Sequence, residues 1–345
     1  MNRYDDYYNF RLATINDVDD IMSFIGSEWK KDHILAQDKE FFLWQYGRSE
    51  YGDLDNINVA LLTDKQNEIL GITGFIAYSD DKDRFDIAPA LTKVKEAGLL
   101  PMTGIEFMKR QMELVGERHH ISSGTNPKTI KPIYERVFKY RVGVMQQYYM
   151  LNDQVKLYNI AKIERKEIVV PTQSGYQLVE FNQLEEVENE FDLSADYDKM
   201  PYKSKEYLKK RYFEHPIYKY KKWKIIAAGG DVVALLFGRE ISINNSKVLR
   251  LVDYRGDAEF IYRLGTAIRT IMYQEQYEYV DMMADVLDEK KMRENGFVLL
   301  DYGGTEIVPN YFEPFVRENV KIHYENDGDC IIFKAEGDQD RPNYR

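Results

Sequence analysis

The stretch KEFFLWQYGRSEY at residues 39–51 returns in altered form as KEYLKKRYFEHPIY at residues 205–218. Aromatic positions match between the two stretches, as Phe41 with Tyr207 shows. A repeat whose copies lie about half a chain apart indicates that one architecture is built twice. The chain has 345 residues, and this length suits two domains of about 150 residues each.

Two strand-like runs follow each copy of the repeat at a similar distance. In the first copy, residues 58–62 and 69–78 are rich in apolar and β-branched side chains, and the turn between them carries Asp, Asn and Lys. In the second copy, residues 223–228 and 232–241 flank a Gly-Gly-Asp turn. Apolar runs on both sides of such a turn are typical of β-hairpins. We therefore predict one hairpin in each half.

Helical patterns surround these hairpins. Apolar residues at spacings of three and four predict a helix over residues 15–25, with Asn16 as its N-cap. Downstream of the hairpin, each half continues with a helix, a strand and a short helix, over residues 105–115, 119–123 and 127–138, and again over residues 260–275, 279–284 and 288–294. This order predicts an α/β fold with a mixed sheet of the α+β kind. We expect two such domains packed side by side, over residues 1–160 and residues 161–345.

The composition excludes several classes of protein. Lys and Arg number 47 against 58 Asp and Glu, so the net charge is −11 and no nucleic-acid partner is expected. The single cysteine, Cys330, can form neither an intrachain disulfide nor a cysteine-based zinc site. The longest clean apolar run, residues 232–237, is far short of the roughly 20 residues that cross a bilayer. We expect a cytoplasmic protein without a membrane partner.

The ends of the two predicted domains carry a family resemblance. IYERVFKY at residues 133–140 and MRENGF at residues 292–297 resemble the end of the GNAT superfamily of acyl-CoA N-acyltransferases, where a helix that carries Tyr leads into a Gly-Phe turn. The resemblance covers both halves as tandem domains. Within the superfamily, residues 29–46 are similar to uncharacterised acyltransferase-like proteins of bacterial surface-polysaccharide and amino-sugar pathways.

The resemblance implies acetyl-CoA or another acyl-CoA as co-substrate, with its pyrophosphate held by backbone N–H groups at a helix start. The matching loop is EAGLLPMTG at residues 96–104, whose candidate contacts are Gly98, Leu99, Thr103 and Gly104. The alternative is that both glycines only shape a turn. In the second copy, residues 255–259 (RGDAE) place carboxylates where phosphates would bind. We therefore expect the second domain to be a degenerate copy that helps to shape an acceptor cleft.

Two further residues follow from the resemblance. Tyr134 falls where many GNAT enzymes place the tyrosine that protonates the leaving thiolate. Core packing is the alternative, and the family's glycine is missing from residues 138–140. Asn126 matches a position that contacts the CoA arm, although an N-cap before Pro127 would explain it equally well.

His33 is the candidate base, because imidazole titrates near neutral pH and aromatic neighbours surround it in the sequence. A structural histidine packed on those aromatic rings is the alternative. His119 and His120 precede or begin a strand, so their side chains point to opposite faces and cannot share one site. No partner at metal-ligand spacing accompanies them, and we predict no metal site.

Acceptor-binding candidates come from both halves. Asp253 and Arg255 stand near the end of a predicted strand, where side chains enter clefts, although an ion pair between them is equally plausible from the sequence. Trp29, Trp44 and Tyr46 cluster in the first copy and would suit stacking against a sugar, or would form core.

The chain ends with an Asp-Gln-Asp motif at residues 338–340, which imitates a metal-binding motif of glycosyltransferases. A solvated tail is the default for such a segment, and its return to the cleft between the domains is the alternative.

Together these features predict an N-acyltransferase that moves an acetyl or related acyl group from acyl-CoA to a small-molecule amine, an amino sugar or a nucleotide-linked amino sugar. Two alternatives stay open. One is FemABX-like aminoacyl transfer from tRNA to a peptidoglycan precursor, although neither a basic tRNA-binding surface nor a coiled-coil arm is evident. The other is a binding protein without catalysis, in which both CoA sites have decayed.

Overall fold

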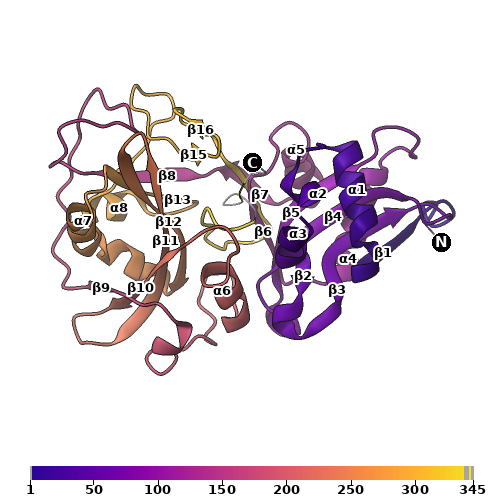
Figure 1. The fold of residues 1–345 in the computed structure, drawn as a ribbon, viewed down its shortest axis with the longest axis horizontal. Coiled ribbons are helices and arrows are strands. Elements are labelled where there is room, and N and C mark those ends of the chain that lie inside the picture. The colour runs from indigo at the N-terminus through magenta and orange to yellow at the C-terminus, as the bar shows by residue number, and fades with distance from the viewer. Residues whose placement is uncertain (1, 338–341, 343–345) are drawn as a thin grey trace.

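The computed structural model describes residues 2–337 and residue 342 of the chain. It contains two large mixed sheets that lie side by side, with helices on their faces (Figure 1). The first sheet runs in the order β1 (Asn9–Thr14), β3 (Asp53–Thr63), β4 (Ile69–Ala77), β5 (Asp86–Val94), β6 (His119–Ser123), β17 (His323–Asn326) and β7 (Arg141–Val144), and the short β2 (Gly47–Arg48) pairs with β3.

The second sheet repeats the plan of the first. Its order is β14 (Val298–Leu299), β8 (Gln146–Leu151), β13 (Tyr279–Ala284), β12 (Ser246–Gly256), β11 (Val232–Ile243), β10 (Lys221–Ile226) and β9 (Gln177–Glu180). Among the named strands, each sheet has one parallel pair, β5 with β6 and β12 with β13, and all other neighbours are antiparallel. The predicted mixed α/β architecture in two tandem copies is confirmed.

Helices cover the sheets. The first half contains α1 (Val18–Glu28), α2 (Ile34–Gln37), α3 (Lys39–Tyr46), α4 (Thr103–Val115) and α5 (Lys131–Ile133), which continues into a π-helical turn, Tyr134–Phe138. The second half contains α6 (Lys205–Tyr212), α7 (Gly265–Gln274) and α8 (Glu289–Glu294). Short 3-10 turns lie at Ile15–Asp17, Ser49–Tyr51, Lys82–Arg84, Leu184–Glu186 and Ala258–Arg263, and a two-strand ribbon joins β15 (Tyr311–Phe312) to β16 (Phe315–Val316). Of the helices described, none is long and apolar enough to cross a membrane.

Strand β3 shows why both faces of the first sheet are covered. Val59 and Leu61 belong to the core under α1 and α3, whereas Ala60 and Leu62 belong to the core under α4. Alternate residues of a strand point to opposite faces, so this continuous apolar run needs a helical layer on each side.

Most predicted elements are present. Both hairpins, β3 with β4 and β10 with β11, are confirmed. The predicted N-cap Asn16 is wrong: residues 15–17 form a 3-10 turn, and Thr14 and Asp17 cap each other reciprocally at its start. The Asp17 carboxylate also forms an ion pair with Arg11, and the hydrogen bond from the Arg11 guanidinium lowers the pKa of Asp17 to about 2. A side chain with these partners is a stronger helix start than the neighbouring asparagine.

The two halves exchange strands. The chain leaves β7 in the first sheet and enters β8, which pairs with β13 and β14 in the second sheet. In return, β17 from the C-terminal part of the chain inserts between β6 and β7 (Figure 1). A division of the chain into residues 1–160 and 161–345 stays a prediction about its two units, and each unit lends a strand to the sheet of the other.

The repeated stretches meet where the halves join. The ring of Trp44, on α3, lies 4.3 Å from the ring of His215, just beyond α6. Nζ of Lys210 donates to the Gly47 carbonyl at 2.9 Å and pairs with Glu50 at 2.7 Å. The two copies of the repeat are therefore packed against each other.

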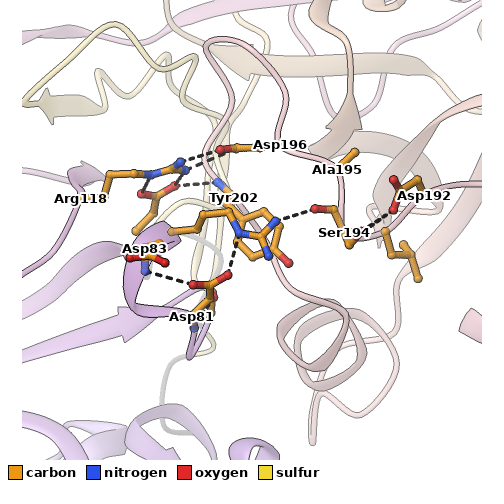
Figure 2. A network of polar contacts seen from close by, with 12 residues as sticks. Asp81, Asp83, Arg118, Asp192, Ser194, Ala195, Asp196 and Tyr202 are labelled. Carbon is orange, nitrogen blue, oxygen red and sulfur yellow. Dashed lines mark hydrogen bonds and ion pairs between the residues drawn. The ribbon is translucent and has the colours of Figure 1, made fainter.

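A polar network also connects the halves (Figure 2). The guanidinium of Arg118 binds both carboxylate oxygens of the buried Asp86, at 2.7 and 2.6 Å, and pairs with Asp196 of the second half at 2.6 Å. The backbone N–H of Tyr202 donates to Asp86 at 2.7 Å, and the Arg84 guanidinium stacks 3.8 Å above the Tyr202 ring. Bidentate arginine–carboxylate geometry of this kind fixes orientation as well as distance.

Candidate functional site

The first sheet opens between its two parallel strands. Strands β5 and β6 pair at Asp86 with His119 and at Ile87 with His120, and beyond these positions the ladder ends. Pro89 follows on β5 and has no N–H to offer to β6. Instead, the hydroxyl of Ser122 donates to the Pro89 carbonyl at 2.8 Å. The strands separate beyond this bridge.

A cavity of about 650 Å³ occupies the space between the separating strands. Its walls are the outer half of β5, the start of α4, the end of β6 and the turn of α5, and its lining includes Trp29, Lys93, Gly104, Asn126, Tyr134 and Glu325. A cleft of this size, largely apolar with a few convergent polar groups, is the usual form of a small-molecule site.

The start of α4 lies at this cavity. The residue before the helix, Met102, has φ of +68°, and the sharp turn brings the helix start to the cavity wall. The Thr103 N–H donates to Leu100, and those of Ile105 and Glu106 donate to Met102, whereas the Gly104 N–H has no acceptor in the described part of the chain. The N-terminus of a helix of 13 residues with an unused N–H is suited to an anion such as pyrophosphate.

Tyr134 lies at the opposite wall of the cavity, and its hydroxyl is 2.9 Å from Nε2 of His120. Nδ1 of His120 is 3.0 Å from the carboxylate of Glu117. All three side chains are almost fully buried. Burial raises the pKa of Tyr134 well above its ordinary value, and the nearby Glu325 carboxylate adds to the rise. Tyr134 is therefore a neutral phenol that can donate a proton at physiological pH.

The other predicted contacts to acyl-CoA divide into two groups. Asn126 lines the cavity and also caps the following turn, since its carbonyl oxygen accepts the N–H groups of Lys128 at 2.9 Å and Thr129 at 3.2 Å. Thr103 is buried with its hydroxyl on the Leu100 carbonyl, at 2.7 Å. Thr103 is not among the described residues that line the cavity.

Gly98 and Leu99 also lie away from the lining. Gly98 is exposed in the left-handed conformation, with φ of +83°, and acts as a turn residue. Leu99 packs on the apolar cluster around Tyr4, Tyr8 and Phe107. A direct role for either residue in binding CoA has no support from these positions.

His33, the predicted base, caps a helix and packs on an aromatic ring. Its Nδ1 accepts the N–H of Leu35 at 3.2 Å and so caps α2, and its ring stacks on Trp29 with centroids 5.1 Å apart. It does not line the cavity in the described structure, whereas Trp29 does and keeps 45% of its surface exposed. The two other aromatic candidates lie elsewhere: Trp44 is at the junction of the halves, and Tyr46 is buried beneath Gly74.

Asp253 and Arg255 are both buried in the second half and do not pair with each other. Asp253 accepts Nζ of Lys203 at 2.5 Å and the Tyr212 hydroxyl. Arg255 donates to the carbonyls of Leu193 and Ala195, and burial lowers its pKa. Neither side chain is in a position to contact an acceptor in the cavity of the first sheet, because both are engaged within the second half.

The two parallel strands of the second sheet, β12 and β13, also separate, but the C-terminal segment fills the space between them. Beyond the pairing of Leu251 with Met282, residues 331–335 insert between β12 and β13. The N–H of Lys334 donates to Met283 on one side at 3.1 Å, and the N–H of Ala335 donates to Val252 on the other at 3.0 Å. The corresponding helix start at α7 is closed too, since Asn295 accepts the Gly265 N–H at 2.6 Å.

The degenerate second copy stays a prediction, and the filling of this space by the C-terminal segment is a feature that the sequence did not reveal. Residues 334–336 reach the first sheet, where the Ser123 hydroxyl donates to the carbonyls of Lys334 and Glu336. The motif at residues 338–340 lies outside the described residues.

Two residues of the site were missed or undervalued from the sequence. Glu325 is the only carboxylate among the described lining residues, and it is buried on β17, some 190 residues after Tyr134 in the chain. Nothing local marks it. His120 could have been found from its alternation with His119: the two side chains do point to opposite faces, His120 to Tyr134 and His119 to Asp327. Within the described residues, no group of three or more potential ligands could hold a metal ion.

Several solved structures are similar to the chain as a whole. A conserved protein of unknown function from Enterococcus faecalis V583, described as a probable N-acyltransferase, is 8% identical, with a TM-score of 0.52 over 85% of this chain and 70% of that chain. A GCN5-related N-acetyltransferase from Anabaena variabilis ATCC 29413 is 10% identical, with a TM-score of 0.49 over 92% and 72%. N-myristoyltransferase of Saccharomyces cerevisiae with bound myristoyl-CoA is 12% identical, with a TM-score of 0.41 over 85% and 79%. No protein-family model and no curated protein sequence matches the chain. At these identities the similarity establishes the fold alone.

Proposed function

We propose, on the premise that this chain has the fold of the GCN5-related N-acetyltransferases in two tandem copies, that it transfers an acyl group from acyl-CoA to an amine. One observation supports this function above the others. The cavity between β5 and β6 joins an uncapped helix start to a buried tyrosine hydroxyl, while the equivalent space in the second sheet is filled. A binding protein with two decayed sites would not keep one of them open.

In this proposal the backbone at the start of α4 holds the pyrophosphate, with the Gly104 N–H as one donor and Lys93 as a nearby cation. The edge of β5 beyond Pro89 binds the pantetheine arm, because its backbone groups no longer pair with β6 and can hydrogen-bond to the amides of the arm. Asn126, at the end of β6, contacts the arm from the same edge.

Two side chains provide the proton transfers. The amine nitrogen attacks the thioester carbonyl carbon, an N–C bond forms and the C–S bond breaks. Glu325 accepts a proton from the attacking nitrogen, and Tyr134 donates a proton to the departing sulfur. The buried, neutral state of Tyr134 suits a donor, and the carboxylate of Glu325 suits an acceptor.

For the acceptor we propose an amino sugar, free or linked to a nucleotide. The support is Trp29, whose indole lines the cavity while remaining half exposed. An exposed aromatic face at a polar site is suited to stacking on a sugar ring.

The test is release of free CoA thiol from acetyl-CoA in the presence of glucosamine, for the wild type and for Tyr134→Phe. General-acid catalysis contributes roughly 10²- to 10⁴-fold, so we expect kcat to fall by at least 100-fold in the variant. Tyr140→Phe is the matched control, because Tyr140 stacks on Tyr134 without lining the cavity in the described structure. Equal rates for wild type and Tyr134→Phe would exclude the tyrosine as the acid. Absence of both transfer and acetyl-CoA binding in the wild type would exclude the function.

A further inference from the structure

We propose that His120 is a positioning residue that supplies protons through Tyr134, with Glu117 holding its ring in the required orientation. This inference rests on the proposed acyl transfer. It adds a buried proton source behind the cavity to the residues that line it.

The hydrogen-bonding capacity of each group decides which atom donates and which accepts between Glu117, His120 and Tyr134. An ionised Glu117 only accepts, so Nδ1 of His120, 3.0 Å away, carries the hydrogen. In the neutral ring Nε2 is then an acceptor, and the Tyr134 hydroxyl, 2.9 Å away, points its hydrogen to the imidazole. When the ring is protonated, Nε2–H donates to the Tyr134 oxygen instead. The phenol hydrogen is then released toward the cavity.

The proton balance follows directly. With His120 protonated, the Tyr134 O–H bond breaks and an S–H bond forms on the leaving thiolate. The His120 Nε2–H proton moves to the Tyr134 oxygen as that bond breaks, so Tyr134 ends as a neutral phenol. His120 ends as a neutral ring and keeps its Nδ1–H on Glu117. No oxidant or further reactant is needed, and solvent protons restore the cationic ring.

Several groups face this relay and set its charge environment. The Tyr140 ring lies 5.4 Å from that of His120 and 5.3 Å from that of Tyr134. The carboxylates of Glu117, Glu325 and Asp327 act on these tyrosines from the loop before β6, from β17 and from the turn after β17. All three of these side chains are acidic, and none of them brings a positive charge to the relay.

The neighbouring His119 takes no part in the relay among the described contacts. His119, adjacent in sequence, faces the other side of the sheet, where its Nδ1 is 3.5 Å from Asp327. It is partly exposed and does not contact Tyr134 among the described contacts. His119→Gln therefore changes the same chemical group one position away and serves as the control for His120→Gln.

The kinetic test uses acetyl-CoA and glucosamine with thiol release as readout. We expect His120→Gln to lower kcat at least tenfold, to leave KM for acetyl-CoA within twofold, and to lose the fall of kcat at high pH that the wild type shows when His120 deprotonates. His119→Gln should match the wild type. An unchanged kcat, or a high-pH fall that persists in His120→Gln, would overturn the proposal. If His120→Gln does not fold, Glu117→Gln replaces it, and the same loss is expected.

The second arm does not depend on activity. Nitrogen-15 spectra of the histidine rings should show neutral His120 as the Nδ1–H form, and Tyr134→Phe should shift its Nε2 signal alone. A neutral Nε2–H form would overturn the proposal even if acyl transfer is demonstrated. A wild type that neither binds nor cleaves acetyl-CoA would instead count against the proposed function and would remove the relay with it.

Discussion

The backbone N–H of Ala335 donates to the carbonyl of Val252 at 3.0 Å, where the strands of the second sheet part. The C-terminal segment thus takes the hydrogen-bonding edges of β12 and β13, and beyond them Gly337 bridges to Ser123 at the end of β6 in the first sheet. The first sheet has a cavity of about 650 Å³ between its parallel strands, whereas the C-terminal segment fills the equivalent space in the second sheet.

This difference predicts one acyl-CoA site per chain. Calorimetric titration with acetyl-CoA should saturate at one equivalent, because the Lys334 and Ala335 amides already occupy the second edge. Two equal sites would mean that the C-terminal segment leaves the space between β12 and β13 in solution. Saturation of the single site should also raise the melting temperature, since a ligand that binds only the folded state stabilises it.

The two helix starts should respond oppositely to an added methyl group. At Gly104 a Cβ atom would have its nearest contact with Val94, at 3.9 Å, so Gly104→Ala should keep or raise stability, by about 0.5–1 kcal/mol. At Gly265 it would fall onto the Asn295 carbonyl oxygen, and Gly265→Ala should destabilise strongly. Thermal unfolding of the two variants measures this contrast.

A larger side chain at the open helix start tests binding. Gly104→Leu should weaken acetyl-CoA at least tenfold in a titration while the melting temperature stays near that of the wild type. Wild-type affinity in this variant would separate the start of α4 from the phosphate site. Equal losses of affinity and stability would mean that Gly104 only shapes the turn.

Arg118→Met should destabilise the junction of the halves by about 2–4 kcal/mol, because it leaves the fully buried Asp86 without its bidentate partner. Lys39→Met is the control, since its ion pair with Asp19 is exposed and such pairs are worth about 0–1 kcal/mol. Urea unfolding measures both. Similar small losses in the two variants would show that the network in Figure 2 is not a main link between the halves.

Glu336 predicts a pH dependence of stability. Nζ of Lys203 lies 2.6 Å from Glu336 and 2.5 Å from Asp253, so one buried ammonium faces two carboxylates. Burial raises the pKa of Glu336 from 4.5 to about 7, against the opposing effect of Lys203. The folded state then retains a proton that the unfolded state loses, so stability falls as pH rises from about 4.5 to about 7.

The variant Glu336→Gln isolates this contribution, because the amide resembles the protonated acid at every pH. The free energy of unfolding of the wild type relative to Glu336→Gln should fall across pH 4.5–7, as measured in urea. A constant difference over that range would mean that Glu336 is ionised in the folded protein at all these pH values.

Local patterns in the sequence were enough for the repeated architecture. The turns between β3 and β4 and between β10 and β11 carry their own signals, and the aromatic matches between α3 and α6 place the two copies. Strand β6 spans residues 119–123, as the order of elements in the sequence predicted.

Long-range pairings account for what the sequence did not reveal. The insertion of β17 beside β6 joins residues about 200 apart, and no local pattern encodes that partner. Glu325 reaches the cavity only through this pairing, and the filling of the second sheet depends on the C-terminal segment in the same way. Asp253 and Arg255 show the converse. Their place near a strand end predicted contact with a cleft. Inside the second half, however, Asp253 pairs with the buried Lys203, and the Arg255 guanidinium lies over the rings of two tyrosines, Tyr197 and Tyr202.

A crystal structure of the protein with CoA tests the central claim most directly. We expect the pantetheine arm between β5 and β6, the pyrophosphate at the Gly104 N–H and the sulfur next to the Tyr134 hydroxyl, with the second sheet unchanged. CoA bound at any other place, or a cavity in the first sheet that stays without CoA at saturating concentration, would contradict it.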